Sequence, residues 1–201
     1  MMMLAATCSL VAASLGIFAD HQDIGITPKK GDVQFDSKNG EYRVTGGGAN
    51  MWFKTDAFQF VYKQVSGDMT LTADVHFVGQ GTEAHRKAAL MVRQSLEPDS
   101  PYADVAVHGD GLTSLQYRPG AGVDTEESRL PIKAPVKIRI ERRGNEFMVS
   151  AGNPGEQMES TGPIIVVMQN PVYVGLAMCS HNADVLETAI FSNVTLTQPR
   201  R

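Results

Sequence analysis

Apolar and polar residues alternate with a period of two along most of this chain. The clearest runs are residues 58–63, 71–77 and 136–141. In the last of these, Val136, Ile138 and Ile140 alternate with charged residues. Successive side chains of a β-strand point to opposite faces of a sheet, so this pattern places one face of each segment against a core and the other towards solvent. The chain is therefore expected to fold from β-strands.

Turn-forming residues separate these runs at short intervals, and no window contains a sustained helical stripe with capping residues. The segment His108-Gly109-Asp110-Gly111 joins two alternating runs and predicts a hairpin. About a dozen short strands without helices predict an all-β fold, an antiparallel two-sheet jelly-roll sandwich. Besides the three runs above, strands are predicted over residues 32–36, 41–45, 88–95, 102–108, 112–118, 146–150, 172–179 and 186–196.

The composition excludes several classes of protein. The chain has 201 residues, of which 42% are hydrophobic and 20% charged, as in a soluble globular domain that can bury its own core. Its 18 Lys and Arg residues against 22 Asp and Glu give a formal net charge of −4. Nucleic-acid binding requires clustered basic residues, so we predict no nucleic-acid partner.

The N-terminal segment has the character of a secretory leader. Residues 1–19 carry no charge and are mostly apolar, but they form too short a stretch for a convincing membrane span. Cleavage after Ala13 and cleavage after Ala19 both obey the small-residue rule. We predict a signal peptide over residues 1–13, cut after Ala13, and one domain over residues 14–201, because the family resemblance described next begins at residue 16. The alternatives are a wrongly assigned start and the end of a preceding domain. Removal of this leader would leave Cys179 as the single cysteine, which excludes an internal disulfide.

Several segments resemble a bacterial domain of the concanavalin A-like lectin/glucanase superfamily. Its members occur alone and also fused behind TolB-like β-propellers. The resemblance covers nearly everything after the leader and implies a concanavalin A-like jelly roll. It is carried by GIFADHQDIG (16–25), GGGANMW (46–52), DAFQFVY (56–62), KAALMVRQS (87–95), SLQYR (114–118), YVGL (173–176) and AIFSNV (189–194).

The resemblance implies less about function, because the superfamily includes both glycan-binding proteins and glycosidases. We predict a non-catalytic, carbohydrate-binding, lectin-like domain of a secreted or periplasmic bacterial protein, with a glycan or polysaccharide as partner. The alternative is a protein-interaction or scaffold module that binds cell-envelope proteins. Glycoside hydrolysis is the third hypothesis. Glucanases of the superfamily carry alternating acids on one strand, whereas Glu126 and Glu127 are adjacent and lie in a predicted loop.

The middle strands carry a polar face that suits a ligand. Alternation places the polar side chains of the runs 88–95, 102–108 and 112–118 on one surface if these strands are neighbours. Planar donors and acceptors of this kind suit sugar hydroxyls or a carboxylate. The alternative is a solvated sheet face with cross-strand ion pairs. The candidate ligand-binding residues on this face are Arg93, Asp104, His108, Gln116 and Arg118.

Two aromatic residues are candidates for stacking on a sugar ring. Trp52 follows three glycines and could present its indole from a loop, although a core position is the alternative. Tyr102 shares the polar face of its strand. The segment His85-Arg86-Lys87 precedes a strand, and its positive charge could rim the same surface and attract an acidic glycan.

The sequence shows no cofactor or metal motif. The five histidines lack zinc-ligand spacing, and no acidic loop has the regular spacing of a known calcium site. We therefore predict no cofactor, and a structural calcium ion stays an open alternative. Cys179 precedes His181 by two residues, but its strand alternation favours a small buried thiol over a nucleophile.

Overall fold

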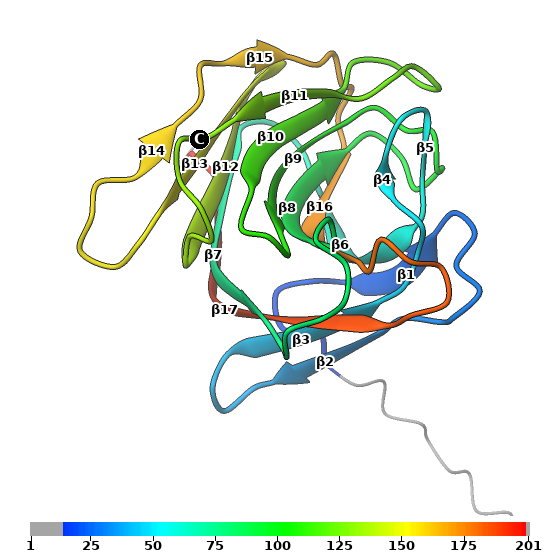
Figure 1. The fold of residues 1–201 in the computed structure, drawn as a ribbon. Helices are drawn as coiled ribbons and strands as arrows, with labels where there is room; N and C mark the ends of the chain where they lie inside the picture. Colours follow the sequence, from blue (N-terminus) through cyan, green and yellow to red (C-terminus); the bar gives the residue numbers. More distant parts are fainter. Residues whose placement is uncertain (1–13, 200–201) are drawn as a thin grey trace, which may run out of the picture.

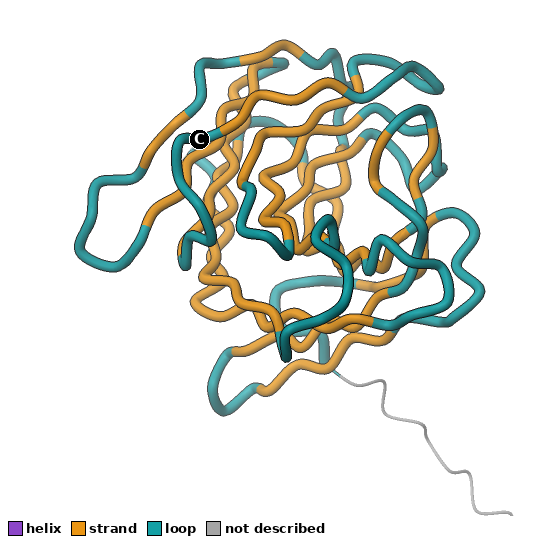
Figure 2. The backbone as a smooth tube through the Cα atoms, viewed as in Figure 1, coloured by secondary structure: helices purple, strands orange, loops and turns teal. Residues whose placement is uncertain are grey.

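A computed structural model describes residues 14–199 as two antiparallel β-sheets that face each other (Figure 1). The tube view shows strands joined by loops and turns, with no helix in the described residues (Figure 2). This confirms the predicted all-β, two-sheet fold. The first sheet runs in the order β1 (Asp20–Ile24), β6 (Phe58–Val65), β16 (Val172–Cys179), β8 (Lys87–Arg93), β9 (Tyr102–His108), β10 (Thr113–Arg118) and β11 (Glu126–Arg129).

The second sheet begins at β14 and ends at β2. Its order is β14 (Glu159–Ser160), β13 (Glu146–Gly152), β12 (Lys137–Arg143), β7 (Met69–Phe77), β17 (Glu187–Thr197), β3 (Glu41–Gly46) and β2 (Asp32–Asp36), and β15 (Ile164–Ile165) pairs with β13. A separate small hairpin is formed by β4 (Met51–Trp52) and β5 (Thr55–Asp56), and we call residues 51–56 the β4–β5 hairpin.

The main core lies between the two sheets. It is built from the apolar positions that alternate along each strand, so the same pattern that predicted strands also supplies the packing surface. Leu90 and Val105 of the first sheet, and Leu71 and Phe191 of the second, are fully buried members of this core. Burial of such side chains is the main favourable term in the folding of a sandwich.

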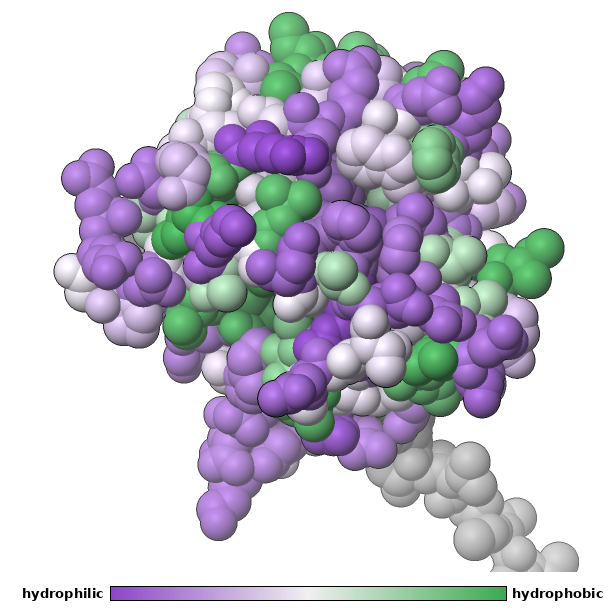
Figure 3. Space-filling view, viewed as in Figure 1, coloured by the Kyte–Doolittle hydropathy of each residue, from purple (hydrophilic) through white to green (hydrophobic). Residues whose placement is uncertain are grey.

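A second apolar cluster covers the opposite side of the first sheet, which we call the outer face. Phe58, Phe60 and Met91 belong to this cluster, and Met51 of the β4–β5 hairpin is buried against them. The hairpin therefore covers part of the outer face, and Figure 1 shows it to the right of strands β8 to β10. On the face shown in the space-filling view, hydrophilic residues predominate and hydrophobic residues are scattered (Figure 3).

Most predicted strands agree with the observed ones to within two residues, including the hairpin between β9 and β10. One prediction was wrong: residues 126–127 lie in β11 and not in a loop. This short edge strand has polar and charged residues on both faces and so lacks apolar alternation, and its backbone pairing with β10 holds it in place.

The structure describes the N-terminal segment only from residue 14 onwards. Residues 16 and 17 form a turn before β1, so the segment 16–18 is not part of the first strand, although Phe18 is buried in the main core. The predicted signal peptide, residues 1–13, lies outside the described residues. Within residues 14–199, no helix has the length and apolar character needed to cross a membrane.

Candidate functional site

Strand register brings part of the predicted polar face together on the outer face of the first sheet. Asp104 of β9 lies opposite Gln116 of β10, and Gln116 in turn lies opposite Glu127 of β11. Lys87 of β8 lies opposite His108 of β9. Four neighbouring strands thus contribute chemically different polar side chains to one surface, as the alternation predicted for β9 and β10.

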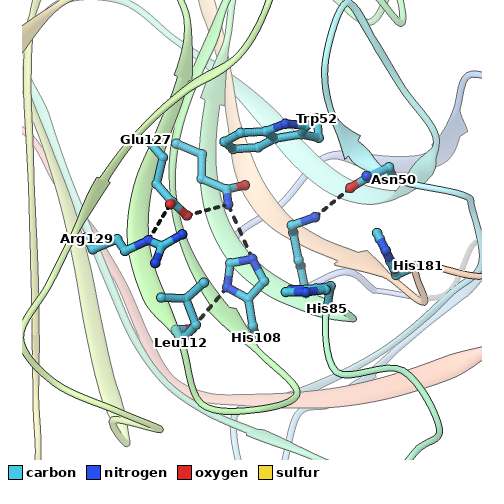
Figure 4. Close-up of a pocket in the computed structure, with 10 residues that line it drawn as sticks. Asn50, Trp52, His85, His108, Leu112, Glu127, Arg129 and His181 are labelled. Carbon is cyan, nitrogen blue, oxygen red and sulfur yellow. Dashed lines mark hydrogen bonds and ion pairs between the residues drawn. The ribbon is translucent and has the colours of Figure 1, made fainter.

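An open cavity of about 220 Å³ lies on this surface, between the sheet and the β4–β5 hairpin (Figure 4). Strands β8 to β11 supply its floor, and loop residues supply its rim. The lining residues are Asn50, Trp52, His85, Lys87, His108, Leu112, Gln116, Glu127, Arg129 and His181.

Trp52 gives the cavity an aromatic wall. The residue is half-buried on β4, and its indole ring lies across one end of the cavity in Figure 4. A ring held in this way presents an apolar, electron-rich face without being sealed in the core. The short hairpin positions it because the buried Met51 anchors the same strand against the sheet.

Lys87 supplies a cation that no carboxylate of residues 14–199 neutralises by a direct ion pair. Its side chain is almost fully buried in the cavity wall, and its Nζ donates a hydrogen bond of 2.6 Å to Asn50 Oδ1. An ammonium group has three N–H donors, and the amide oxygen takes one. Burial lowers the pKa of Lys87 from its ordinary value, which reflects the cost of holding this charge away from water.

A chain of hydrogen bonds fixes the floor of the cavity. His108 Nδ1 donates to the Leu112 carbonyl oxygen at 3.0 Å, which leaves Nε2 of the neutral ring as an acceptor. The Gln116 amide nitrogen donates to His108 Nε2 at 3.3 Å and to Glu127 Oε1 at 3.5 Å. Arg129 Nε pairs with Glu127 Oε2 at 2.6 Å. Gln116 is almost fully buried, and its Oε1 has no hydrogen-bond partner within the described residues.

The environment of His108 predicts a pH dependence of stability. Burial lowers its pKa from 6.5 to about 4, so between these pH values the unfolded chain binds a proton that the folded chain does not. The free energy of unfolding is therefore highest above about pH 6.5 and falls as the pH drops towards 4, by up to about 2–3 kcal/mol. The free energy of unfolding, measured by urea denaturation, should change less between about pH 6.5 and 5 in His108→Gln than in the wild type. Equal changes would contradict this assignment.

Three histidines that are distant in sequence meet at the cavity. The His85 ring lies 5.9 Å from the His108 ring and 5.6 Å from the His181 ring, measured between centroids. Sequence spacing did not predict this group, because the three residues come from a loop, β9 and a loop after β16. No group of three or more His, Cys, Asp or Glu side chains within residues 14–199 is placed to hold a metal ion.

Arg93, Arg118 and Tyr102 lie on the predicted face but do not line the cavity. Both arginines are fully buried beneath the β4–β5 hairpin and pair with Asp56. Tyr102 is also fully buried, and its hydroxyl contacts the Met51 carbonyl oxygen at 3.3 Å. These side chains hold the hairpin on the sheet, so neither the expected ligand contact nor the expected solvated ion pairs describe them.

Asp104 is the other predicted residue that lies beneath the surface. Its side chain is fully buried, and neither carboxylate oxygen has a hydrogen-bond partner within the described residues. Burial raises the pKa of Asp104 well above its ordinary value, because the charged form loses its hydration. No ion pair joins Asp104 to Lys87 within the described residues.

The cavity contains residues that the sequence analysis did not select. Asn50 and Arg129 had no distinguishing pattern, and Glu127 was placed in a loop. The segment His85-Arg86-Lys87 was expected at the rim of this surface, and His85 and Lys87 do line the cavity, whereas Arg86 is buried and pairs with Glu187. Lys87 also shares the two-residue alternation of Met91 and Arg93 on β8, which places it on the outer face. Cys179 is buried as expected, and burial raises its pKa to about 11, which disfavours the thiolate.

Comparison with known proteins identifies the fold. No family model matches the chain, and no curated protein matches it by sequence. A protein of unknown function from Saccharomyces cerevisiae superposes with a TM-score of 0.66 at 15% identity, over 90% of this chain and 98% of that one. The carbohydrate-binding module CBM66 from Bacillus subtilis gives a TM-score of 0.55 at 13% identity, over 90% and 98% of the two chains.

An enzyme is also among the similar structures. The xylan β-1,4-xylosidase from Bacillus halodurans superposes with a TM-score of 0.60 at 15% identity, over 83% of this chain but only 34% of the enzyme. Likenesses at this level of identity show a shared fold and not a shared activity. The chain has the two-sheet jelly-roll sandwich found in carbohydrate-binding modules, lectins and parts of glycoside hydrolases.

Proposed function

We propose that this protein binds a saccharide, without catalysis, in the cavity between the β4–β5 hairpin and strands β8–β11. The observation that carries the proposal is Gln116 Oε1, a buried acceptor without a partner at a cavity that also contains the underused donors of Lys87. A buried polar atom without a partner costs free energy, which a ligand hydroxyl would recover. Trp52 adds the aromatic face on which a pyranose ring can stack.

The composition of the cavity argues for binding over hydrolysis. Glycoside hydrolysis uses two carboxyl groups on either side of the bond that breaks, about 5–9.5 Å apart. Glu127 is the single carboxylate among the residues that line this cavity, and it is already paired with Arg129. The fold of CBM66 supports saccharide binding as a role for this scaffold. The uncharged N-terminal segment supports placement of the protein outside the cytoplasm.

A glycan array probed with the full chain tests the proposal, and the ligands found are then titrated against variants of Trp52. We expect Trp52→Ala to weaken binding by about tenfold or more, taking as a guide the stacking of a nucleobase on an aromatic side chain, which contributes about 1–3 kcal/mol. Trp52→Phe keeps an aromatic face and should retain most of the affinity. Because Trp52 is half-buried, both variants should keep the wild-type circular dichroism spectrum.

Two results would count against saccharide binding in this cavity. An array without signal from a folded sample would overturn the proposal and favour a protein-interaction module, whose partner could be sought in envelope extracts with excess free glycans present. Equal affinities of wild type and Trp52→Ala for a saccharide would place its binding site elsewhere on the molecule.

A further inference from the structure

The cavity contains a positive charge that the protein itself leaves without a direct partner. Lys87 Nζ has one neutral acceptor, Asn50 Oδ1, although its side chain is almost fully buried. A buried ammonium group normally pairs with a carboxylate, because the loss of hydration otherwise costs on the order of several kcal/mol. The missing partner is therefore the feature that needs a physical explanation.

The other charged groups around Lys87 do not supply that partner. Asp56 is engaged by Arg93 and Arg118, and Glu127 is engaged by Arg129 at 2.6 Å. Asp104 is fully buried, and no ion pair joins it to Lys87 within the described residues. Because Arg129 and Glu127 neutralise each other, the ammonium group of Lys87 leaves the lining of the cavity with one net positive charge.

Two of the three histidines at the cavity, His108 and His181, do not change this balance at neutral pH. Burial lowers the pKa of His108 to about 4 and also lowers that of His181, so both rings are neutral. Neutral imidazole rings can donate or accept a hydrogen bond, and they would serve the remaining oxygens of an anionic group. The cavity thus combines one unpaired cation with neutral polar neighbours, an aromatic wall and a free amide oxygen.

We propose that the saccharide bound here carries one acidic group per recognised sugar, and that this group pairs with Lys87. This inference rests on the proposed function and specifies its ligand class. One cation matches one negative charge, as in the carboxylate of a uronic acid or a single sulfate ester. Gln116 and Trp52 would contact the hydroxyls and the ring face of the same sugar, since they line the same cavity.

Matched acidic and neutral saccharides test this proposal on the full chain. Isothermal titration calorimetry would compare oligogalacturonate, oligoguluronate and oligoglucuronate with the same oligomers after reduction of their carboxyl groups to alcohols. A singly sulfated galactose oligomer, set against its unsulfated form, separates a sulfate ester from a carboxylate. We expect at least one acidic oligomer to bind about tenfold or more tightly than its neutral counterpart, as a charge-assisted hydrogen bond would provide.

Variants of two lysines test whether Lys87 is the group responsible. Lys87→Gln should weaken binding of the acidic oligomer by about tenfold to hundredfold and leave the weak binding of the neutral form nearly unchanged. Lys38→Gln removes the same charge from the exposed turn between β2 and β3, on the other sheet, and should have no effect. Both variants are compared with the wild type by circular dichroism to confirm folding.

A measurement without substitutions keeps the test valid if Lys87→Gln does not fold. Raising the ionic strength from about 0.05 to 0.3 M should weaken binding of the acidic oligomer and leave binding of the neutral oligomer unchanged. Equal affinity for the acidic and reduced forms, or an unchanged affinity in folded Lys87→Gln, would overturn the acidic-ligand inference and leave saccharide binding intact. Failure of every saccharide to bind would overturn the proposed function and this inference together.

Discussion

Replacing Asp56 with alanine is expected to lower the free energy of unfolding by about 3–5 kcal/mol. Arg118 pairs with Asp56 through two hydrogen bonds, Nη2–Oδ1 at 2.6 Å and Nη1–Oδ2 at 2.8 Å, and Arg93 Nη2 lies 3.5 Å from Oδ2. All three side chains are fully buried. The substitution leaves two buried guanidinium groups without their carboxylate. Urea denaturation followed by circular dichroism measures the loss.

One further variant separates the charge of Asp56 from its shape, and a second removes an exposed carboxylate as a control. Asp56→Asn keeps an oxygen that accepts a hydrogen bond, so its loss should be smaller than that of Asp56→Ala, at about 1–3 kcal/mol. Asp32→Ala removes an exposed carboxylate from β2 and should change stability by less than about 0.5 kcal/mol. A loss below about 1 kcal/mol for Asp56→Ala would show that this buried group does not hold the hairpin on the sheet.

Glu187→Ala breaks a second buried ion pair and is expected to lower the free energy of unfolding by a similar amount, about 3–5 kcal/mol. Arg86 Nη1 lies 2.6 Å from Glu187 Oε2, with both side chains less than 10% exposed, and the guanidinium group lies 4.3 Å above the centre of the Phe77 ring. Space around Arg86 is tight, because a Cβ added to Gly81 would lie 2.1 Å from its Nη1. Denaturation with guanidinium chloride measures the change in the free energy of unfolding.

The Arg86–Glu187 pair also affects the candidate site. Arg86 is adjacent to His85, which lines the cavity, so loss of the pair should disturb the cavity rim and weaken ligand binding as well. The double variant Arg86→Met, Glu187→Leu replaces both ions with apolar side chains and should recover much of the stability lost in Glu187→Ala. A double variant no more stable than Glu187→Ala would indicate that packing, and not the unpaired charge, causes the loss.

The strands of the first sheet could be predicted because each has one buried face with a regular two-residue alternation. The limits of β9 and β16 were predicted to the residue, and those of β8 to within two residues. The grouping of His108 with Gln116 followed from the same alternation. Edge strand β11 escaped prediction because backbone pairing with β10, and not an apolar face, fixes it.

The burial of Arg93 and Arg118 could not be predicted from their own strands. Their partner Asp56 comes from a hairpin whose strands are two residues long, too short to show any alternation. Alternation identifies which side chains share a face, but it does not say what covers that face. The three-dimensional path of the β4–β5 hairpin therefore decides which predicted residues become structural and which remain at the cavity.

The β4–β5 hairpin connects the stability of the protein with its proposed function. Asp56 fastens one end of the β4–β5 hairpin to the sheet, and Trp52 on the same hairpin forms a wall of the cavity. The buried cluster beneath the hairpin thus holds the indole in place before any ligand arrives. Such preorganisation reduces the entropy lost on binding. Asp56→Ala should consequently weaken ligand binding even under conditions where the protein remains folded.

Tryptophan fluorescence is the most direct test of saccharide binding at this cavity. Trp52 is the single tryptophan of the chain, so a change in its emission reports on the surroundings of this one residue. Titration of the full chain with a saccharide that calorimetry shows to bind should change the emission saturably, with the same dissociation constant by both methods. Calorimetric binding that leaves the fluorescence unchanged, and is equally strong in Trp52→Ala, would contradict saccharide binding in this cavity.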